Sequence, residues 1–360
     1  MPDVSKHFPW LLALLVAGCS SAEDVPQAVS EAFETAPEEV QRVAPGASRE
    51  ENFQNPAEAI AFYTAEIARN PKDEPAYRQR GNIYFEIGDH GKAVADYTAA
   101  IELTPTTKSY YNRGVACTAM DKLDQAIEDY TAAIKLTPKD SPEDAVSAYF
   151  NRGVVLHRLG KTAQGISDLD EAIRLDEADP TGPLNRGKLF LALGFYDKAL
   201  ADFDRAIVLD ATSVDAHINR GYILDALGQY DLAIKDFTQA IVISPECALA
   251  YCDRGISYTK KRDFEQALRD IDRAILIDPE QAQFFNNRGT AHFDMNEHPQ
   301  ALADFSKAIE LQPKLASAYR NRGATYLFLG DEAKARADFS AALAIEPNNT
   351  ERIPEGYGKR

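Results

Sequence analysis

An asparagine, an arginine and a glycine stand side by side again and again along this sequence. The side-chain amide of asparagine both donates and accepts hydrogen bonds, so it can bond both polar groups of a peptide unit. In two copies a glutamine or an aspartate takes the first place, and the full set is Gln79, Asn112, Asn151, Asn185, Asn219, Asp253, Asn287 and Asn321. A regular series of amides indicates a surface that holds an extended peptide.

The residue types that usually bind metals or perform catalysis are scattered. None of the 6 histidines has a partner at helical metal-ligand spacing, and no phosphate loop or nucleophile motif occurs. Cys247 and Cys252 lie on either side of a predicted turn, which leaves free thiols and a disulfide both open. We therefore expect no catalytic residue, no metal and no cofactor, and the chain is not expected to be an enzyme.

Composition narrows the class of partner. The 360 residues include 39 Lys and Arg against 56 Asp and Glu, which gives a net charge of −17. Because phosphate contacts need a basic surface, this balance argues against nucleic acid as a partner. The 4 cysteines are too few for a disulfide scaffold, and 45% hydrophobic residues indicate a folded chain.

The helices that position the asparagines can be predicted from a repeat in the sequence. The glycines of the tripeptide are separated by 33, 39 and then five times by 34 residues, a period typical of stacked helix pairs. Alanine, an aromatic residue and a second alanine recur at fixed places after each glycine, as in Ala199, Phe203 and Ala206, and a proline such as Pro245 ends most repeats. Over residues 74–349 this pattern resembles the tetratricopeptide repeat family.

The resemblance implies an all-α fold, a right-handed superhelical solenoid of eight helix pairs over residues 74–349. Residues 56–73 match only the second helix of a pair and predict an N-terminal half repeat, with Asn55 as the N-cap and Pro56 in the first turn. The solenoid then spans residues 56–349. Residues 350–360 contain Pro354, Gly356 and Gly358 and predict a tail without a capping helix.

Helix geometry assigns the faces of each pair. An α-helix turns about 100° per residue, so the recurring glycine of the first helix, helix A, faces the second, helix B, and its small size predicts close approach. The arginine before each glycine and an aspartate on helix B border the same face. They predict an ion pair within or between repeats. The arginines are Arg80, Arg113, Arg152, Arg186, Arg220, Arg254, Arg288 and Arg322, and the aspartates are Asp96, Asp129, Asp168, Asp202, Asp236, Asp270, Asp304 and Asp338.

The asparagines lie on the opposite face of helix A, which in tetratricopeptide solenoids lines a concave groove. Apolar residues of the middle repeats share this face, namely Tyr111, Phe150, Leu184, Ile218 and Tyr222. We expect these residues and the asparagines, with Asp253 in the sixth repeat, to bind client proteins or extended peptides. Two alternatives stay open: the asparagines bond neighbouring repeats, and the apolar side chains pack on the neighbouring helix A.

The N-terminal segment is expected to lie outside the solenoid. Its apolar run is shorter than the roughly 20 residues of a membrane span and is typical of a signal peptide, residues 1–18. The residues before Cys19 resemble a bacterial lipobox, which implies a lipid on Cys19. Residues 19–55 hold eight acidic residues against two arginines and predict a flexible tether.

Together these features predict a lipid-anchored, non-enzymatic adaptor or scaffold of the bacterial cell envelope. Ser20 after Cys19 implies the periplasmic face of the outer membrane. The expected partners are client proteins in the groove and the membrane through the anchor, and a homo-oligomer stays open. The alternatives are a pilotin-like assembly factor for a secretion or pilus system, and a regulatory subunit of an envelope protease or peptidoglycan hydrolase.

Overall fold

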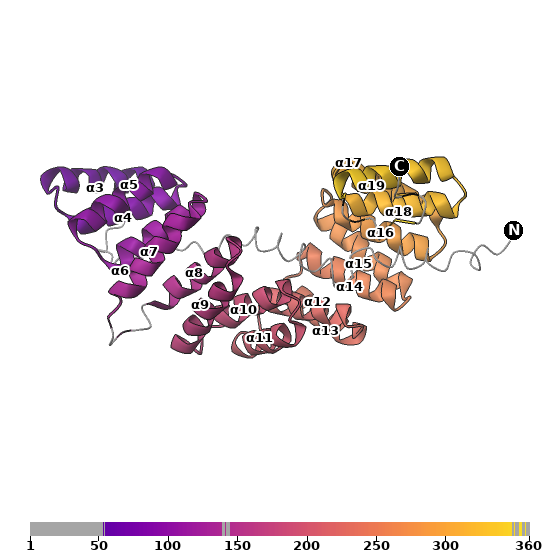
Figure 1. Ribbon diagram of the computed structural model, residues 1–360, viewed down its shortest axis with the longest axis horizontal. Helices are drawn as coiled ribbons and strands as arrows, with labels where there is room; N and C mark the ends of the chain where they lie inside the picture. The colour runs from indigo at the N-terminus through magenta and orange to yellow at the C-terminus, as the bar shows by residue number, and fades with distance from the viewer. Residues whose placement is uncertain are drawn as a thin grey trace. The chain divides into compact units, whose positions relative to one another are not determined.

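The computed structural model describes residues 53, 55–138, 141, 145–347, 349, 353, 354 and 357. In this part of the chain there are seventeen α-helices and no strand, as the resemblance implies (Figure 1). The predicted signal peptide lies outside the described residues, and so does the predicted tether apart from residues 53 and 55.

The helices alternate between the two types that the repeat predicts. The first helix of the described residues is α3 (Pro56–Arg69). The A helices are α4 (Glu74–Glu86), α6 (Thr107–Ala119), α8 (Val146–Arg158), α10 (Thr181–Ala192), α12 (Val214–Ala226), α14 (Ala248–Lys260), α16 (Ala282–Asp294) and α18 (Ala316–Phe328). The B helices are α5 (His90–Leu103), α7 (Leu123–Leu136), α9 (Thr162–Leu175), α11 (Tyr196–Leu209), α13 (Tyr230–Ile243), α15 (Phe264–Ile277), α17 (His298–Leu311) and α19 (Glu332–Ile345).

The described residues divide into two compact units, one up to Leu193 and one from Gly194. Within each unit a B helix packs both on the A helix before it and on the A helix after it, as α13 does on α12 and α14. The boundary between the units follows α10, the A helix of the fourth predicted repeat.

The half repeat begins where its capping residues predict. The side chain of Asn55 accepts a hydrogen bond from the backbone N–H of Glu58 at 3.0 Å, and Pro56 occupies the first turn of α3. The ring of Phe53 lies 5.4 Å from that of Phe62, so an apolar contact precedes the cap. These contacts stabilise α3 as the first helix of the unit.

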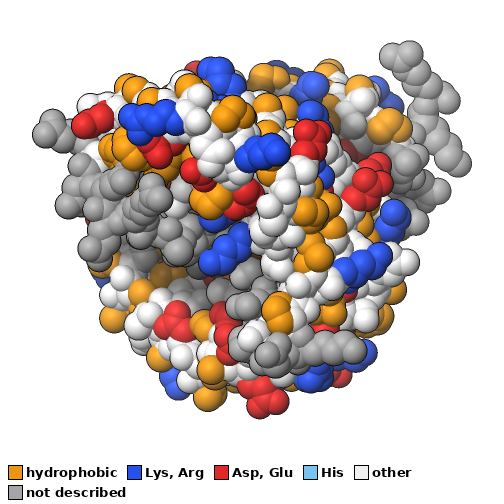
Figure 2. Space-filling model, turned by 90° about the vertical axis from the view of Figure 1, so that its left-hand side faces the viewer, with side chains coloured by type: hydrophobic (Ala, Val, Ile, Leu, Met, Phe, Trp, Pro, Cys, Tyr) orange, Lys and Arg blue, Asp and Glu red, His pale blue; other side chains and the backbone are white. Residues whose placement is uncertain are grey.

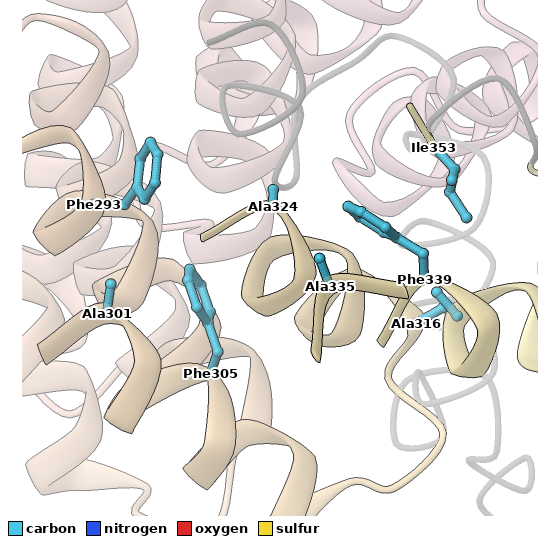
Figure 3. Packing of buried hydrophobic residues seen from close by; sticks show 9 residues of the cluster. Phe293, Ala301, Phe305, Ala316, Ala324, Ala335, Phe339 and Ile353 are labelled. Atoms are coloured by element: carbon cyan, nitrogen blue, oxygen red, sulfur yellow. The ribbon is translucent and has the colours of Figure 1, made fainter. Parts of the chain in front are cut away.

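In five of the helix pairs the core depends on a glycine that faces an aromatic ring, and Gly153 and Gly255 face aliphatic side chains instead. In the last two repeats Phe305 and Phe339 are fully buried among alanines (Figure 3). A Cβ atom added at Gly289 would lie 2.7 Å from Cε1 of Phe305, and one at Gly323 would lie 3.0 Å from Cε1 of Phe339. The close approach predicted for this glycine is confirmed.

The end of the last helix pair is covered without a helix. Ile353 is buried in the same cluster as Phe339 (Figure 3), and the ring of Tyr357 lies 5.6 Å from that of Phe339. The guanidinium of Arg336 lies over Tyr357 at 4.7 Å. Two side chains from beyond α19 thus cover the apolar end of the stack.

The predicted ion pairs form in every repeat whose two partners belong to one unit. In the sixth repeat Nε of Arg254 donates to Oδ2 of Asp270 at 2.7 Å and its second amino group donates to Oδ1 at 2.8 Å. Such a two-bond fork is the strongest geometry for this pair. The other forks are Arg80–Asp96, Arg113–Asp129, Arg152–Asp168, Arg220–Asp236, Arg288–Asp304 and Arg322–Asp338.

The same guanidinium also reaches the preceding repeat. The remaining amino group of Arg254 donates to Oγ1 of Thr238 on α13 at 3.0 Å. All eight arginines make this bond, to a threonine, serine or aspartate at the equivalent place of the preceding B helix: Thr64, Thr98, Thr131, Asp170, Asp204, Thr238, Asp272 and Ser306. Each forked arginine therefore joins three helices.

Replacement of one forked arginine is expected to destabilise the unit. In Arg254→Ala the carboxylate of Asp270 stays buried without its counter-charge, at a cost of about 3 kcal/mol. The control Arg273→Ala removes an arginine that is 39% exposed and pairs with Glu246, at a cost below about 1 kcal/mol. Urea unfolding of the two variants measures the difference, and equal small losses would contradict a structural role for the fork.

Candidate functional site

The face of the A helices opposite the B helices carries the predicted asparagines. We call it the A-helix face. Because every A helix presents the same turn to its neighbours, the equivalent residues of successive repeats come into contact, as α14 and α16 do. The asparagines are thus arranged as a column within each unit.

The predicted exposure of these asparagines is wrong for most of them. Asn112 is 0% exposed, Asn151 is 2% exposed and Asn321 is 3% exposed, while Asn185 and Asn287 are also buried. The reason is that the A helix of the adjacent repeat encloses the amide, which the angle on a single helix does not show. Whether the column contacts a client stays a prediction.

Four of the amides bond the preceding A helix. The Nδ2 group of Asn112 donates to Oδ1 of Asn82 at 2.9 Å, and that of Asn321 donates to Oδ1 of Asn286 at 3.0 Å. Asn151 donates to the hydroxyl of Tyr111, and Asn287 to the sulfur of Cys252. The alternative that the sequence left open, bonding between neighbouring repeats, therefore holds at these four positions.

The other two asparagines bond their own helix. Asn185 donates to the carbonyl oxygen of Thr181 at 2.9 Å, and Asn219 donates to that of Asp215 at 2.8 Å. Asn219 is only partly buried. Among the predicted asparagines it is the one that the structure leaves accessible at the A-helix face.

The apolar residues predicted for the groove differ between the two units. Phe150 and Leu184, on α8 and α10 of the first unit, are buried. Tyr111 is partly buried and bonded to Asn151, and Ile218 and Tyr222 are also partly buried. An accessible apolar surface at this face is thus found mainly in the unit that begins at Gly194.

The sequence reasoning missed one exposed apolar residue within the A helices of that unit. Leu249, in the first turn of α14, is 55% exposed. Comparison of the repeats could have identified Leu249 from the sequence, because the equivalent residues are polar or proline: Pro75, Lys108, Ser147, Thr181, Asp215, Gln283 and Ser317. With Ile218, Tyr222 and Ile256, which are partly buried, Leu249 forms what we call the α12–α14 patch.

A group of charged residues lies on the same two helices. Ser257 donates to Oδ1 of Asp225 at 2.7 Å, and the ammonium of Lys260 pairs with Oδ2 of the same carboxylate. Asp253 stands where six repeats have asparagine. Burial and, next, the negative charge of Asp225 raise the pKa of Asp253 to about 7, while Lys260 acts in the opposite direction.

Charged side chains of both signs lie close together on the surface. On the face drawn in Figure 2, Lys and Arg side chains are interspersed with Asp and Glu, and hydrophobic side chains lie among them. Cys117, Cys247 and Cys252 are free thiols. Within the described ranges, no group of three or more His, Cys, Asp or Glu has the arrangement of a metal site, and none of the helices there has the length and hydropathy to span a membrane.

The raised pKa of Asp253, which is partly buried, predicts a pH-dependent stability. The pKa of Asp253 is higher in the folded chain than its ordinary value of 3.8, so the folded state binds this proton more tightly. The stabilising effect of the proton is complete below about pH 4 and is lost as the pH rises to about 7. Asp253→Asn should therefore stabilise the chain at about pH 8, on the order of 1–2 kcal/mol, and change little at about pH 4.

Thermal unfolding at the two pH values measures this effect. Asn fits here, since six repeats carry it at this place. The control Asp197→Asn, at an exposed residue of α11, should show no such pH dependence. A gain for Asp253→Asn that is the same at both pH values would contradict the burial of a charge.

Solved structures resemble this fold. A tetratricopeptide repeat protein from Parabacteroides merdae aligns with a TM-score of 0.53 and 21% identity, over 73% of this chain and 98% of its own. PilW, a type IV pilus biogenesis factor, aligns with a TM-score of 0.53 and 18% identity, over 57% of this chain and 96% of its own. At these identities the likeness concerns the fold alone.

Curated proteins match over short stretches. The chain is 36% identical over 65 residues to a protein SGT1 homologue of Oryza sativa subsp. japonica, which is 18% of either chain. It is 37% identical over 68 residues to Hsp70-Hsp90 organizing protein 2 of Arabidopsis thaliana, 19% of this chain and 12% of that one. The chain thus spans less than a fifth of the length of these relatives.

Family models cover nearly all of the helix pairs. Four models described as tetratricopeptide repeat match residues 75–107, 107–140, 146–179, 184–246, 248–281, 282–315 and 316–349. These ranges coincide with the repeats that the glycine spacing predicts. By sequence pattern, helix order and packing, the chain belongs to the tetratricopeptide repeat family.

Proposed function

We propose that this chain is a lipid-anchored, non-enzymatic adaptor of the bacterial cell envelope that holds client proteins against the A-helix face of its second unit. Tetratricopeptide repeats indicate a protein–protein interaction adaptor or scaffold. The observation that carries the proposal is the α12–α14 patch, in which Leu249 is 55% exposed and Ile218, Tyr222 and Ile256 are partly buried.

The patch has the composition of a protein contact. Aromatic and aliphatic anchors provide most of the binding energy of such contacts, and Tyr222 and Leu249 are of this kind. Asn219 lies beside them, and its Oδ1 is an acceptor for a backbone N–H of the client.

The anchor is proposed from the sequence around Cys19. A lipidated Cys19 would join the membrane to the first helix through residues 19–55, whose contour length is at most about 120 Å. Several acyl chains provide stable attachment, because each buried methylene contributes about 0.8 kcal/mol. The tether then allows the A-helix face to meet clients at a distance from the membrane.

A photo-crosslinking amino acid at Leu249 tests the contact in intact cells. We expect one dominant adduct, because the client packs on the α12–α14 patch. The matched control is Leu232 on α13, which is 50% exposed against 55% for Leu249 but lies on a B helix. Equal adducts from both sites, or none from Leu249, would refute the patch as the client surface.

The same contact predicts a loss of affinity without a loss of stability. Tyr222→Ala with Leu249→Ser should weaken binding of the crosslinked client at least about tenfold, because both anchors are removed. Leu232→Ser should leave the affinity unchanged. Melting temperatures of all three chains establish whether the fold is intact, and full client affinity in the double variant would argue against the proposal.

Lipidation of Cys19 is tested by mass and partitioning. The wild-type chain should end at Cys19, carry acyl chains in its intact mass and enter the detergent phase. Cys19→Ser should remain an unprocessed precursor of full length. Cys247→Ser is the control for loss of a thiol elsewhere. A mature wild-type mass without acyl chains would exclude the lipobox interpretation.

A further inference from the structure

The carboxylate of Asp253 has no partner among the described residues. Asp253 lies on α14, in the place where six repeats carry asparagine. No hydrogen bond or ion pair joins it to any described residue, and it experiences only burial and the charges of Asp225 and Lys260. The carboxylate of Asp225 on α12 is by contrast fully engaged, since Ser257 donates to one oxygen and Lys260 to the other. Asp253 therefore keeps an open acceptor at a partly buried place.

The column of amide bonds is interrupted at this aspartate. Asn287 on α16 donates to Cys252, which lies 35 residues earlier on α14, and Asn321 makes the equivalent bond in the next repeat. The residue at the same distance before Asp253 is Ile218, whose side chain has no polar atom. An ionised carboxylate also has no proton to donate. The bond that Asn287 makes to the preceding A helix is thus missing here, and the carboxylate stays available to another molecule.

The charge around Asp253 is negative. Its carboxylate and that of Asp225 lie near the single ammonium of Lys260, so one negative charge is in excess when all three groups are ionised. Asp215 on α12 is also near, because both Asp253 and Asp215 raise the pKa of the Cys247 thiol, for which burial is the main cause. A positively charged group is therefore attracted to this place.

Apolar side chains border the open carboxylate. Leu249 precedes Asp253 by four residues and Ile256 follows it by three, so the three side chains share one face of α14. Leu249 and Ile256 belong to the α12–α14 patch, in which Leu249 is 55% exposed. A ligand that complements this surface has an apolar group beside a positive charge.

The number of free oxygen atoms decides between a metal ion and a basic side chain. Calcium takes about six to eight oxygen ligands, and magnesium requires near-octahedral geometry. The single open carboxylate of Asp253 does not provide such a set, and Asp225 is already bonded. The ammonium of a lysine or the guanidinium of an arginine needs only one carboxylate, and the charge-assisted bond between them is strong.

We propose that the α12–α14 patch binds client segments in which a lysine or arginine stands beside apolar residues, and that Asp253 pairs with the basic side chain. The inference rests on the client surface proposed above and names what that surface selects. Apolar contacts hold the segment, while the carboxylate fixes its register and its charge. Asparagine would stabilise the fold at about pH 8, so the aspartate lowers stability at a place where it can bind.

Selection from a display library of random peptides tests this preference without knowledge of the client. The bait is the purified full chain in detergent at about pH 8, where Asp253 is ionised. We expect the wild-type chain to enrich peptides with lysine or arginine next to apolar residues. Asp253→Asn should lose the preference for a basic residue. The matched control Asp197→Asn, which removes an exposed carboxylate of α11, should keep it.

Calorimetry with one selected peptide measures the pair itself. Asp253→Asn should raise the dissociation constant about tenfold or more, the loss expected for a bond to a charged group. A peptide with norleucine in place of the lysine should bind the wild-type chain equally weakly, and Asp253→Asn should not weaken it further. Because the pKa of Asp253 is about 7, wild-type affinity should also fall about tenfold from about pH 8 to about pH 6, and that of Asp253→Asn should not.

The outcomes separate this inference from the proposed function. Selected peptides without basic residues, the same preference in Asp253→Asn, or undiminished affinity for the norleucine peptide would each overturn it, and thermal unfolding verifies the fold of both variants. The photo-crosslink at Leu249 tests the client surface independently. A dominant adduct whose crosslinked segment contains no lysine or arginine would leave that surface in place and refute only the charge preference. The absence of any adduct would overturn both.

Discussion

One guanidinium group per repeat sets the geometry of this protein. Its fork to an aspartate fixes helix A against helix B, and its third bond fixes that pair against the preceding B helix, as Arg254 does between Asp270 and Thr238. The planar group has a fixed set of donor directions, so it orients both neighbours at once. The aromatic ring before it, Tyr251 in this repeat, lies 5.7 Å from the guanidinium and limits its rotamers. The packing of alanines and aromatic rings around this junction then follows from helix orientation.

The helices and the contacts within each pair could be predicted from the sequence, because they depend on residues of a single repeat. The start of α3 at Pro56, the glycine opposite Phe305 and the Arg254–Asp270 fork all involve residues whose faces follow from the helical angle. The asparagine column could not be predicted in the same way. The burial of Asn112 depends on how closely the next A helix approaches, and this distance is set by side chains of two repeats together.

Two further features could not be predicted from the helical pattern. Ile353 and Tyr357 cover the last helix pair. They belong to a segment rich in proline and glycine, in which no periodic pattern predicts a buried side chain. Leu249 is visible only when the repeats are compared at one place in the first turn of helix A. In a repeat protein the shared residues hold the fold, so a departure such as Leu249 or Asp253 indicates what one part of the chain does differently from the rest.

The third arginine bond also has a mechanical meaning. Arg80 is the first arginine of the series. Its guanidinium donates one hydrogen bond to the neutral hydroxyl of Thr64 on α3, at 3.0 Å and at an exposed site. The next link is the fork from Arg80 to Asp96, with two charged bonds in a part-buried site. This polar link from α3 to the first pair is weaker than the fork within that pair, so under a pull on the N-terminal segment we expect α3 to open before α4 separates from α5. The fourteen residues of α3 would then lengthen the linkage.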